Sequence, residues 1–420
     1  MKLPEPVWHF PTSVEIPQDL LGAVGGHPLV SQSLVQRGIK NIPEALSFLD
    51  PERYHPANPD DLPGLVDTCE RLWHAICSGE WIGVWGDFDV DGQTSTALLT
   101  GILRDLGANV CYHIPDRDKE SNGIKLNYLK AFVQGNSTED IKVPACPGKL
   151  RVLLTCDTGI TGHEAADWCR ENDIDMLITD HHSLPQVLPH AYAVVNPHLL
   201  PPEHPLQYLC GVGVSLIVAE KLCDLAQKPR LHEKYLDLAA IGTIADVAEL
   251  RADNRWLVQK GLLHLRQYQR PAIQSMLQIS GTNPDNLSEE HISFVLAPRM
   301  NAIGRLGNAN SMVPFLLSND VEETKIIAQQ LEGLNDQRKS LCSDVLAGCL
   351  AQITANPDLA ASEALVLDHP EWHPGVVGIV ASRLVEIFHK PVLLIKASEG
   401  VTGRGSARSI PGVNIIEAID

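Results

Sequence analysis

The chain has 420 residues, of which 44% are hydrophobic and 20% charged, and its formal net charge is -19. This composition is typical of a globular protein with two or three cores, and no stretch approaches the ~20 consecutive apolar residues of a membrane-spanning helix. The negative charge argues against non-specific binding of nucleic acid over a broad basic face, although it leaves room for a local positive site. Taken alone, the charge favours an enzyme that acts on a small molecule.

The ten cysteines form no C-x-x-C pair, and Cys156 lies inside an apolar run. In a chain of this length, scattered cysteines are typical of reduced thiols rather than of a disulfide framework. The first 20 residues contain four prolines and no apolar segment of the kind found in signal peptides. These features predict a cytoplasmic protein.

Four regions follow one another along the chain. Residues 1–65 are rich in proline and include short helical segments, which indicates an N-terminal extension. Residues 66–255 alternate apolar strands with helical segments, the pattern of a parallel α/β domain. Residues 256–360 have apolar side chains at helical spacing, notably from Val321 to Leu350, and suggest a helical connector. From residue 361 the strand signal returns, and it predicts the start of a smaller mixed α/β domain.

Three carboxylates follow the first predicted strand. Asp87, Asp89 and Asp91 occupy alternate positions after the apolar run from Trp81 to Trp85. Carboxylates at the exit of a buried strand repel one another unless a cation neutralises them, and hard divalent ions prefer such oxygen ligands. A calcium loop of the EF-hand type is excluded, because it needs a preceding helix and a glutamate at its twelfth position, which here is Leu98. A solvated acidic turn remains an alternative for this motif alone.

Three further apolar segments end in acidic or imidazole side chains: 150–156 before Asp157, 175–179 before Asp180-His181-His182, and 236–244 before Asp246. The carboxyl ends of parallel strands converge where the strand order reverses, so we expect these groups to meet in one crevice. Aspartate together with histidine is the ligand set of manganese-type hydrolytic centres. The sequence therefore predicts a site for metal-dependent hydrolysis.

These motifs together resemble the DHH phosphoesterase superfamily, which is named for the triplet that stands here as Asp180-His181-His182. Within it, the chain is most similar to the RecJ-like, single-strand-specific exonucleases. The segments that carry this resemblance are Gly86–Gly92, Ala297–Arg305, Trp372–Arg383 and Gly403–Ser409. The resemblance runs from about Arg37 to the last residue.

The chain departs from that family at two places. After Pro115-Asp116-Arg117 the family usually has a Gly-Tyr-Gly step, whereas this chain reads Glu120-Ser121-Asn122-Gly123. The chain also stops at Asp420, before the family's G-G-H-x-x-A-A-G segment and the OB-fold domain that usually follows. The resemblance thus implies a C-terminally truncated form, with a DHH catalytic domain over 66–255 and the start of a DHH-associated substrate-binding domain over 361–420.

The resemblance also implies two Mn²⁺ or Mg²⁺ ions with Asp157 as the bridge between them. Asp87 could instead accept a hydrogen bond from a group behind the metal ligands, or simply cap the end of the strand. Asp180 could accept a hydrogen bond from an imidazole, while His182 could bind metal, donate to the scissile phosphate or face the core. The expected metal ligands are Asp87, Asp89, Asp91, Asp157, His181 and Asp246. The expected catalytic residues are Asp89, Asp91, Asp157, His181, His182 and Asp246.

Phosphate recognition is expected from three arginines and a serine, because a guanidinium binds phosphate oxygens bidentately and glycines near Ser406 allow a close approach. In RecJ-like enzymes such residues form a pocket for the 5′ phosphate. For Arg299 and Arg305, an ion pair between the two lobes is the alternative role. Met300 and Trp372 are predicted to be core residues rather than base-stacking platforms. The expected substrate-binding residues are Arg117, Arg299, Ser406 and Arg408.

The leading interpretation is a metal-dependent 5′-to-3′ exonuclease of recombination and repair. Its substrate would be single-stranded DNA with a 5′ end, and a single-strand-binding protein or a helicase is a candidate partner. Polarity and DNA preference come from the resemblance, since the residues indicate only phosphodiester hydrolysis. One alternative is a DHH-type phosphodiesterase on short oligonucleotides or cyclic dinucleotides, which the acidic charge would suit. Another is an inactive scaffold that binds DNA ends, although an intact set of mutually repelling carboxylates argues against it.

Overall fold

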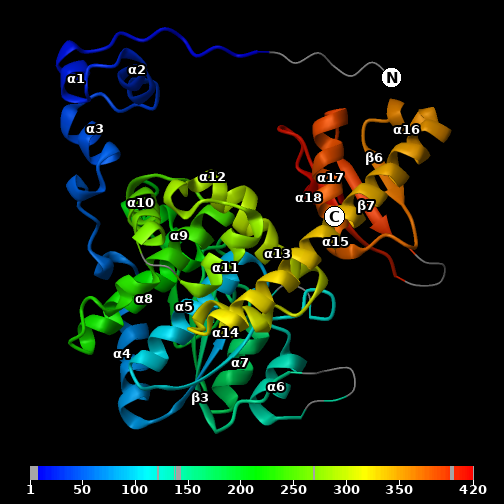
Figure 1. Cartoon of the computed structure of the whole chain (residues 1–420). Coiled ribbons are helices and arrows are strands. Elements are labelled where there is room, and N and C mark those ends of the chain that lie inside the picture. Colours follow the sequence, from blue (N-terminus) through cyan, green and yellow to red (C-terminus); the bar gives the residue numbers. More distant parts are fainter. Residues whose placement is uncertain are drawn as a thin grey trace. The chain divides into compact units, whose positions relative to one another are not determined.

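The structure is a computed structural model, and it describes residues 8–120, 123–136, 138, 143–267, 270–397 and 402–419. The chain divides into two compact units (Figure 1). The larger unit comprises residues 10–304 and 308–329, and the smaller one comprises 305–307 and the chain from residue 330 onward. The four domain boundaries expected from the sequence stay a prediction.

A five-stranded parallel sheet forms the centre of the larger unit, with the strand order β2-β1-β3-β4-β5. The central strands are apolar runs that are buried along nearly their whole length, as expected of strands covered on both faces. The strand order reverses between β1 and β3, and in open parallel sheets ligands bind at the carboxyl ends of the strands beside such a reversal. The strands are β1 (Trp81–Trp85), β2 (Asn109–His113), β3 (Leu150–Cys156), β4 (Asp175–Thr179) and β5 (Ala193–Val195).

Helices cover both faces of this sheet. On one face, α6 (Leu126–Gln134) and α7 (His163–Glu171) enclose a buried cluster that includes Trp85, Phe132 and Leu153. The other face packs against helices that also contact one another: α4 (Leu65–Ser78), α5 (Val90–Asp105) and α8 (Gly211–Leu225). This two-layered covering of a parallel sheet confirms the α/β fold expected from the sequence.

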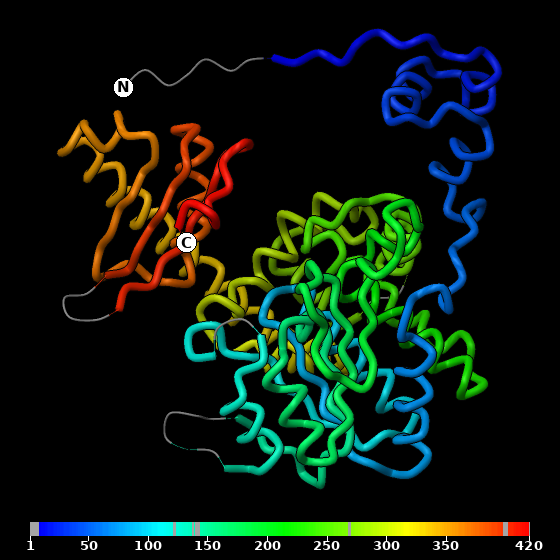
Figure 2. Tube along the Cα trace, turned by 180° about the vertical axis from the view of Figure 1, so that it is seen from behind, coloured from blue at the N-terminus to red at the C-terminus, as the bar shows by residue number. Residues whose placement is uncertain are grey.

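Further helices extend the same unit beyond the sheet. Helix α9 packs against α5, α8 and α10, and both views show α8 and α9 beside α5 (Figures 1 and 2). A π-helical turn, η7, leads directly into α13. These elements are α9 (Leu236–Ala245), α10 (Ala252–Gln267), α11 (Pro271–Ser280), α12 (Glu289–His291), η7 (Ile292–Leu296), α13 (Ala297–Leu306) and α14 (Met312–Leu317).

The N-terminal extension contains three short helices, two of which begin with a proline in the first turn, where the missing N–H is not needed. They have a small core of their own around Leu20, Leu34 and Ile39. The helices are α1 (Gln18–Ala23), α2 (Pro28–Gln36) and α3 (Ile42–Leu49).

The smaller unit contains a three-stranded mixed sheet with the order β6-β7-β8, in which β6 is parallel and β8 antiparallel to β7. Its core joins this sheet to α17 and to the second half of the long helix α15, and it includes Trp372 with 5% of its surface exposed. This mixed sheet agrees with the expected α/β fold of the second domain. The elements are α15 (Val321–Ala355), α16 (Pro357–Ala361), β6 (Leu365–Asp368), α17 (Pro374–Phe388), β7 (Val392–Lys396), β8 (Arg404–Arg408) and α18 (Ile415–Ile419).

Two other expectations from the sequence can be compared with the structure. All ten cysteines lie in the described part of the chain, and each is a free thiol. Met300 is fully buried and Trp372 nearly so, which confirms that both are core residues. Among the described residues, no helix is both long and apolar enough to cross a bilayer.

Candidate metal centre

Carboxylates and imidazoles from several elements converge at the carboxyl end of the sheet, beside the reversal of strand order. They form three overlapping clusters, in each of which the possible ligand atoms lie within 4.8 Å of one another. Asp157 belongs to two of these clusters, and so does His181. The three clusters therefore form one continuous site. The clusters are Asp87, Asp89 and Asp157; Asp91, His181 and Asp246; and Asp157, His181 and His182. The structure thus brings together every residue that the sequence suggested as a metal ligand.

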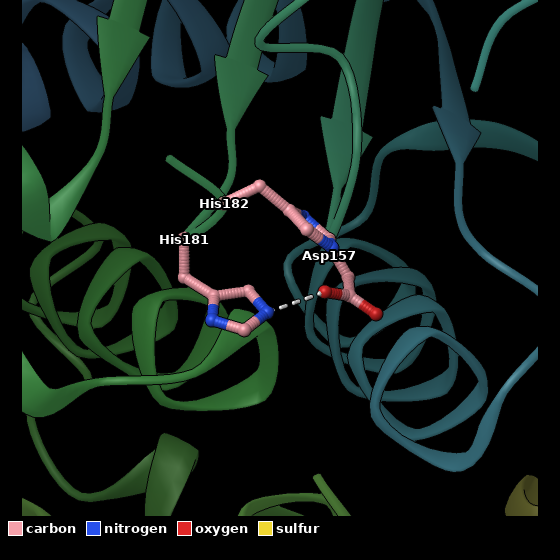
Figure 3. Close-up of side chains that lie close together, drawn as sticks. All are labelled: Asp157, His181 and His182. Atoms are coloured by element: carbon pink, nitrogen blue, oxygen red, sulfur yellow. Dashed lines mark ion pairs between the residues drawn. The ribbon is translucent and has the colours of Figure 1, made fainter. Parts of the chain in front are cut away.

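Asp157 lies at the centre of this site, directly after β3. Its Oδ1 atom is 3.0 Å from Nε2 of His181 (Figure 3). This contact would be an ion pair only with a protonated imidazole, and burial, followed by the neighbouring His182, lowers the pKa of His181 to about 4, so the imidazole is neutral at pH 7. Asp157 Oδ1 is buried and has no hydrogen-bond donor among the described residues. A neutral imidazole and a buried carboxylate that face each other are typical of two ligands of a shared cation.

The buried carboxylates carry an electrostatic cost that a cation would relieve. Burial, followed by repulsion from Asp89, raises the pKa of Asp87 to about 7. Burial and repulsion from Asp91 raise the pKa of Asp157 well above its ordinary value. Burial and Asp89 also raise the pKa of Asp246 to about 6. Burial of several acids together is unfavourable unless a positive charge balances them, so the donor set fits a divalent cation.

Asp91 is fixed by the start of a helix. Its two carboxylate oxygens accept hydrogen bonds from the backbone N–H groups of Gly211 and Val212, both at 2.7 Å. These residues begin α8, where unpaired N–H groups and the helix dipole favour a negative charge. A Cβ at position 211 would lie 2.5 Å from Cβ of Asp157, so glycine is needed here for α8 to approach β3.

Asp180 organises the histidine pair. Its Oδ1 accepts hydrogen bonds from the backbone of His181 (2.7 Å) and from Nδ1 of His182 (2.7 Å), while its Oδ2 accepts from the backbone of Ile160 (2.9 Å). Burial alone would raise the pKa of Asp180, but these hydrogen bonds outweigh it and hold the pKa below its usual value. The same hydrogen bond raises the pKa of His182 to about 9. The two adjacent histidines therefore differ in charge at neutral pH: His181 is neutral and His182 is protonated.

The backbone is strained beside two of the candidate ligands. Asp157 has a φ of 58° and Val247, directly after Asp246, has a φ of 61°. This left-handed conformation is uncommon for aspartate and unfavourable for a β-branched residue. Such strain is concentrated at functional sites, where the surrounding structure compensates for it.

The residues expected to recognise phosphate lie in both units. Arg117 has its guanidinium 5.0 Å from the ring centre of Phe88, and Arg299 donates to the carbonyl of Val295 at 2.7 Å, both within the larger unit. In the smaller unit, Arg408 donates to Oγ of Ser406 at 3.1 Å on strand β8. Ser406 and Arg408 alternate along the strand and thus share one face.

Sequence reasoning missed three sets of contacts that the structure shows. It gave no role to the N-terminus of α8, although the glycines flanking Val212 before an apolar helix were a signal. It also missed Asn310, whose side chain holds both backbone polar groups of Ile114. The third is the pair His113 and Glu120, which no motif marks. Ser121 and Asn122, where the chain departs from the expected Gly-Tyr-Gly step, lie outside the described residues.

Comparison with known proteins identifies the class of this fold and site. The pattern of the DHH family, N-terminal domain, matches residues 81–243, and that of the DHHA1 domain matches residues 359–420. The chain is 34% identical to the single-stranded-DNA-specific exonuclease RecJ of Salmonella typhimurium over 97% of this chain and 69% of the relative. It is also 34% identical to RecJ of Bacillus subtilis, over 93% of this chain and 48% of the relative. The chain belongs to the RecJ family of DHH proteins.

Solved structures agree with this assignment. A crystal structure of exonuclease RecJ bound to manganese superposes with a TM-score of 0.74 at 33% identity, covering 87% of this chain and 86% of that chain. RecJ from Thermus thermophilus in complex with Mn²⁺ superposes with a TM-score of 0.78 at 31% identity, covering 97% of this chain and 56% of that chain. The same Thermus protein is known in complex with Mg²⁺. The chain spans about half to two thirds of the length of the curated relatives.

Proposed function

We propose that this chain is a metal-dependent exonuclease that hydrolyses single-stranded DNA from its 5′ end. The observation that carries the proposal is the cluster of buried carboxylates and a neutral imidazole at the reversal of strand order. The RecJ relatives, which are single-stranded-DNA-specific exonucleases, support the choice of substrate. Recombination and repair are the processes in which such an activity would serve.

Two divalent cations fit the arrangement of the candidate ligands. Oδ1 of Asp87 and Oδ1 of Asp157 are both buried without a donor among the described residues. Asp157 and His181 each belong to two of the clusters, and of the two only Asp157 has a pair of carboxylate oxygens with which it would hold both ions. When bound, divalent ions supply Lewis-acid activation of water and neutralise the charge that develops on the phosphate. Mn²⁺ and Mg²⁺ both suit this set of oxygen and imidazole ligands.

His182 and Asp180 are assigned roles other than metal binding: contact with the substrate and positioning of the histidines. In the metal-free protein, the hydrogen bond to Asp180 raises the pKa of His182 to about 9, and this hydrogen bond favours the protonated imidazole. The side chain of His182 is 57% exposed, whereas that of His181 is 19% exposed. We assign to His182 a hydrogen bond to the scissile phosphate, and to His181 the role of metal ligand. Asp180 positions both through its carboxylate.

A phosphodiesterase that acts on short oligonucleotides or cyclic dinucleotides is the second candidate, because the net charge of -19 disfavours long polyanions. The products separate the two functions. An exonuclease releases mononucleotides stepwise from long strands, whereas the alternative enzyme turns over short substrates alone. For the first function, a single-strand-binding protein or a helicase is the proposed partner, and the reduced cysteines favour the cytoplasm.

We expect the enzyme to prefer strands with a phosphorylated 5′ end, and Arg408→Ala to remove most of that preference. A terminal phosphate has more charge and more acceptor oxygens than an internal diester, so a bidentate guanidinium distinguishes between them by about tenfold or more. The measurement is kcat/KM on otherwise identical strands that begin with a phosphate or a hydroxyl group.

Arg338→Ala is the matched control for this prediction. Arg338 belongs to the same unit, and its guanidinium is held by Oδ1 of Asn335. Its removal changes the net charge equally and should leave the preference for the phosphate intact. Equal rates of the unsubstituted enzyme on both kinds of end would contradict the role assigned to Arg117, Arg299, Ser406 and Arg408.

A further inference from the structure

We propose that the buried pair formed by His113 and Glu120 positions Arg117 for phosphate recognition. This inference rests on the proposed function, since it concerns one of the arginines to which that function assigns the 5′ phosphate. Neither His113 nor Glu120 is expected to touch the substrate. Both are positioning residues, and they act through the segment of chain that carries Arg117.

Glu120 closes the segment 114–120 back onto the end of the strand that precedes it. Its Oε2 lies 2.9 Å from Nε2 of His113, the last residue of β2, and its Oε1 accepts a hydrogen bond from the backbone of Asp116 at 2.9 Å. The side chain of His113 is 2% exposed and that of Glu120 is 3% exposed. A single buried carboxylate thus fixes the residue directly before Arg117.

The other end of this segment is fixed as well. Asn310 donates to the carbonyl of Ile114 at 2.7 Å and accepts from its N–H at 2.8 Å, so its amide pairs with the backbone as a neighbouring strand would. His113 itself is held by Trp85, whose ring centre is 4.5 Å from that of the imidazole. Arg117 therefore projects from a short segment that is anchored at both ends.

The anchored arginine lies beside the candidate metal centre. Its guanidinium is placed over the ring of Phe88, which stands between Asp87 and Asp89 in the sequence. The backbone of Phe88 is fixed in turn, because its carbonyl accepts from the side chain of Gln93 at 2.7 Å. The geometry links Glu120 and His113, through Arg117, to the carboxylates that would hold the metal.

The choice of residues favours positioning over simple stabilisation. Burying a carboxylate has a desolvation penalty that its partners seldom repay, and apolar residues of similar volume would often stabilise a fold more. What a buried pair of this kind does provide is a single defined geometry, because each oxygen requires its own donor. A defined geometry matters here, since misplacing a recognition group by an ångström costs up to ~100-fold in rate.

The test compares Glu120→Ala and Glu120→Gln with Asp253→Ala as the matched control. Asp253 is a buried carboxylate of the same unit that also accepts from one side chain, the hydroxyl of Tyr54, and from one backbone N–H, that of Ala57. The readout is the ratio of kcat/KM on 5′-phosphorylated strands to that on 5′-hydroxyl strands, measured in the otherwise unchanged chain and in the Arg117→Ala background.

Glu120→Ala should lower this ratio by about tenfold, with the main change in KM, because Arg117 is no longer held in register. In the Arg117→Ala background, Glu120→Ala should lower the ratio no further. Glu120→Gln keeps an oxygen for the N–H of Asp116 and should stay close to the unsubstituted enzyme. Asp253→Ala should weaken the fold without changing the ratio. If Glu120→Ala does not fold, Asn310→Ala frees the other end of the segment and should lower the ratio as well.

The possible failures can be told apart. If the unsubstituted enzyme discriminates between the two ends and Glu120→Ala discriminates equally well, the positioning role is wrong and the phosphate site stands. An additive loss in the Arg117→Ala background would also overturn the positioning role. If the unsubstituted enzyme does not discriminate at all, the phosphate site is wrong and the positioning role falls with it.

Discussion

Asp157→Ala is expected to abolish hydrolysis while the fold stays intact. The substitution removes the carboxylate that two of the ligand clusters share, and with it the proposed contact to both ions. We expect kcat to fall by about 1,000-fold or more, which corresponds to roughly 4 kcal/mol of lost transition-state stabilisation. Release of mononucleotides at saturating Mn²⁺ measures the loss.

The stability of this variant distinguishes a lost ligand from a damaged fold. Removing Asp157 relieves repulsion among the buried acids, whereas alanine at a φ of 58° is more strained than aspartate, so the metal-free variant should unfold at about the same temperature as the unsubstituted protein. Asp175→Ala is the control, because Asp175 pairs with Arg71 at the amino end of β4, opposite the site, and its loss should leave kcat unchanged. Retention of more than a few per cent of activity by Asp157→Ala would contradict the assignment of Asp157.

Divalent metal is expected to stabilise the protein increasingly as the pH rises from about 6.5 to 9. The folded-state pKa of Asp87, about 7, lies above the ordinary value, as does that of His182, about 9. Groups with a raised folded-state pKa contribute their full stability below the unfolded pKa and lose it as the pH rises through the folded one. The metal-free protein should therefore lose stability from about pH 4 to 7 through Asp87 and from about pH 6.5 to 9 through His182. His181, whose pKa is lowered to about 4, acts in the opposite direction, but only below about pH 6.5.

Bound metal should offset the part of this loss that comes from the acids, because it replaces the repulsion between ionised carboxylates by attraction. At a metal concentration of 100 times the Kd, the free energy of unfolding should rise by about 2.7 kcal/mol. Thermal unfolding with and without Mn²⁺ across the pH range measures both effects, and Asp157→Ala should lose most of the metal-dependent shift. A metal-free protein that grows more stable from pH 6.5 to 9 would contradict the hydrogen bond assigned to His182 and Asp180. A metal-dependent shift that does not grow as the pH rises through about 7 would contradict the account of the buried acids.

Much of the site could be predicted because its ligands come directly after apolar segments. The strands before Asp87 and Asp157 are recognisable as continuous apolar runs, and parallel strands bring the residues at their carboxyl ends to one edge of a sheet. Asp246 illustrates the limit of this reasoning. The mostly apolar segment before it is helix α9, and short apolar runs do not distinguish a buried helix from a buried strand.

The rest of the site could not be predicted, because it depends on groups that leave no trace in residue type. Asp91 is held by backbone N–H groups 120 and 121 residues away, which any residue with an N–H could supply. The left-handed conformations of Asp157 and Val247 follow from packing, and their side chains give no signal of it. The anchoring of Arg117 depends on Asn310, which is 196 residues from its partner Ile114.

The most direct test of the proposed function uses long single strands of DNA that are labelled at either the 5′ or the 3′ end, incubated with and without Mn²⁺. We expect the 5′ label to appear at once as a mononucleotide and the 3′-labelled strand to shorten stepwise, in both cases only with the metal present. Release of the 3′ label first would contradict the proposed polarity. Turnover confined to short oligonucleotides would contradict the exonuclease itself and favour the phosphodiesterase.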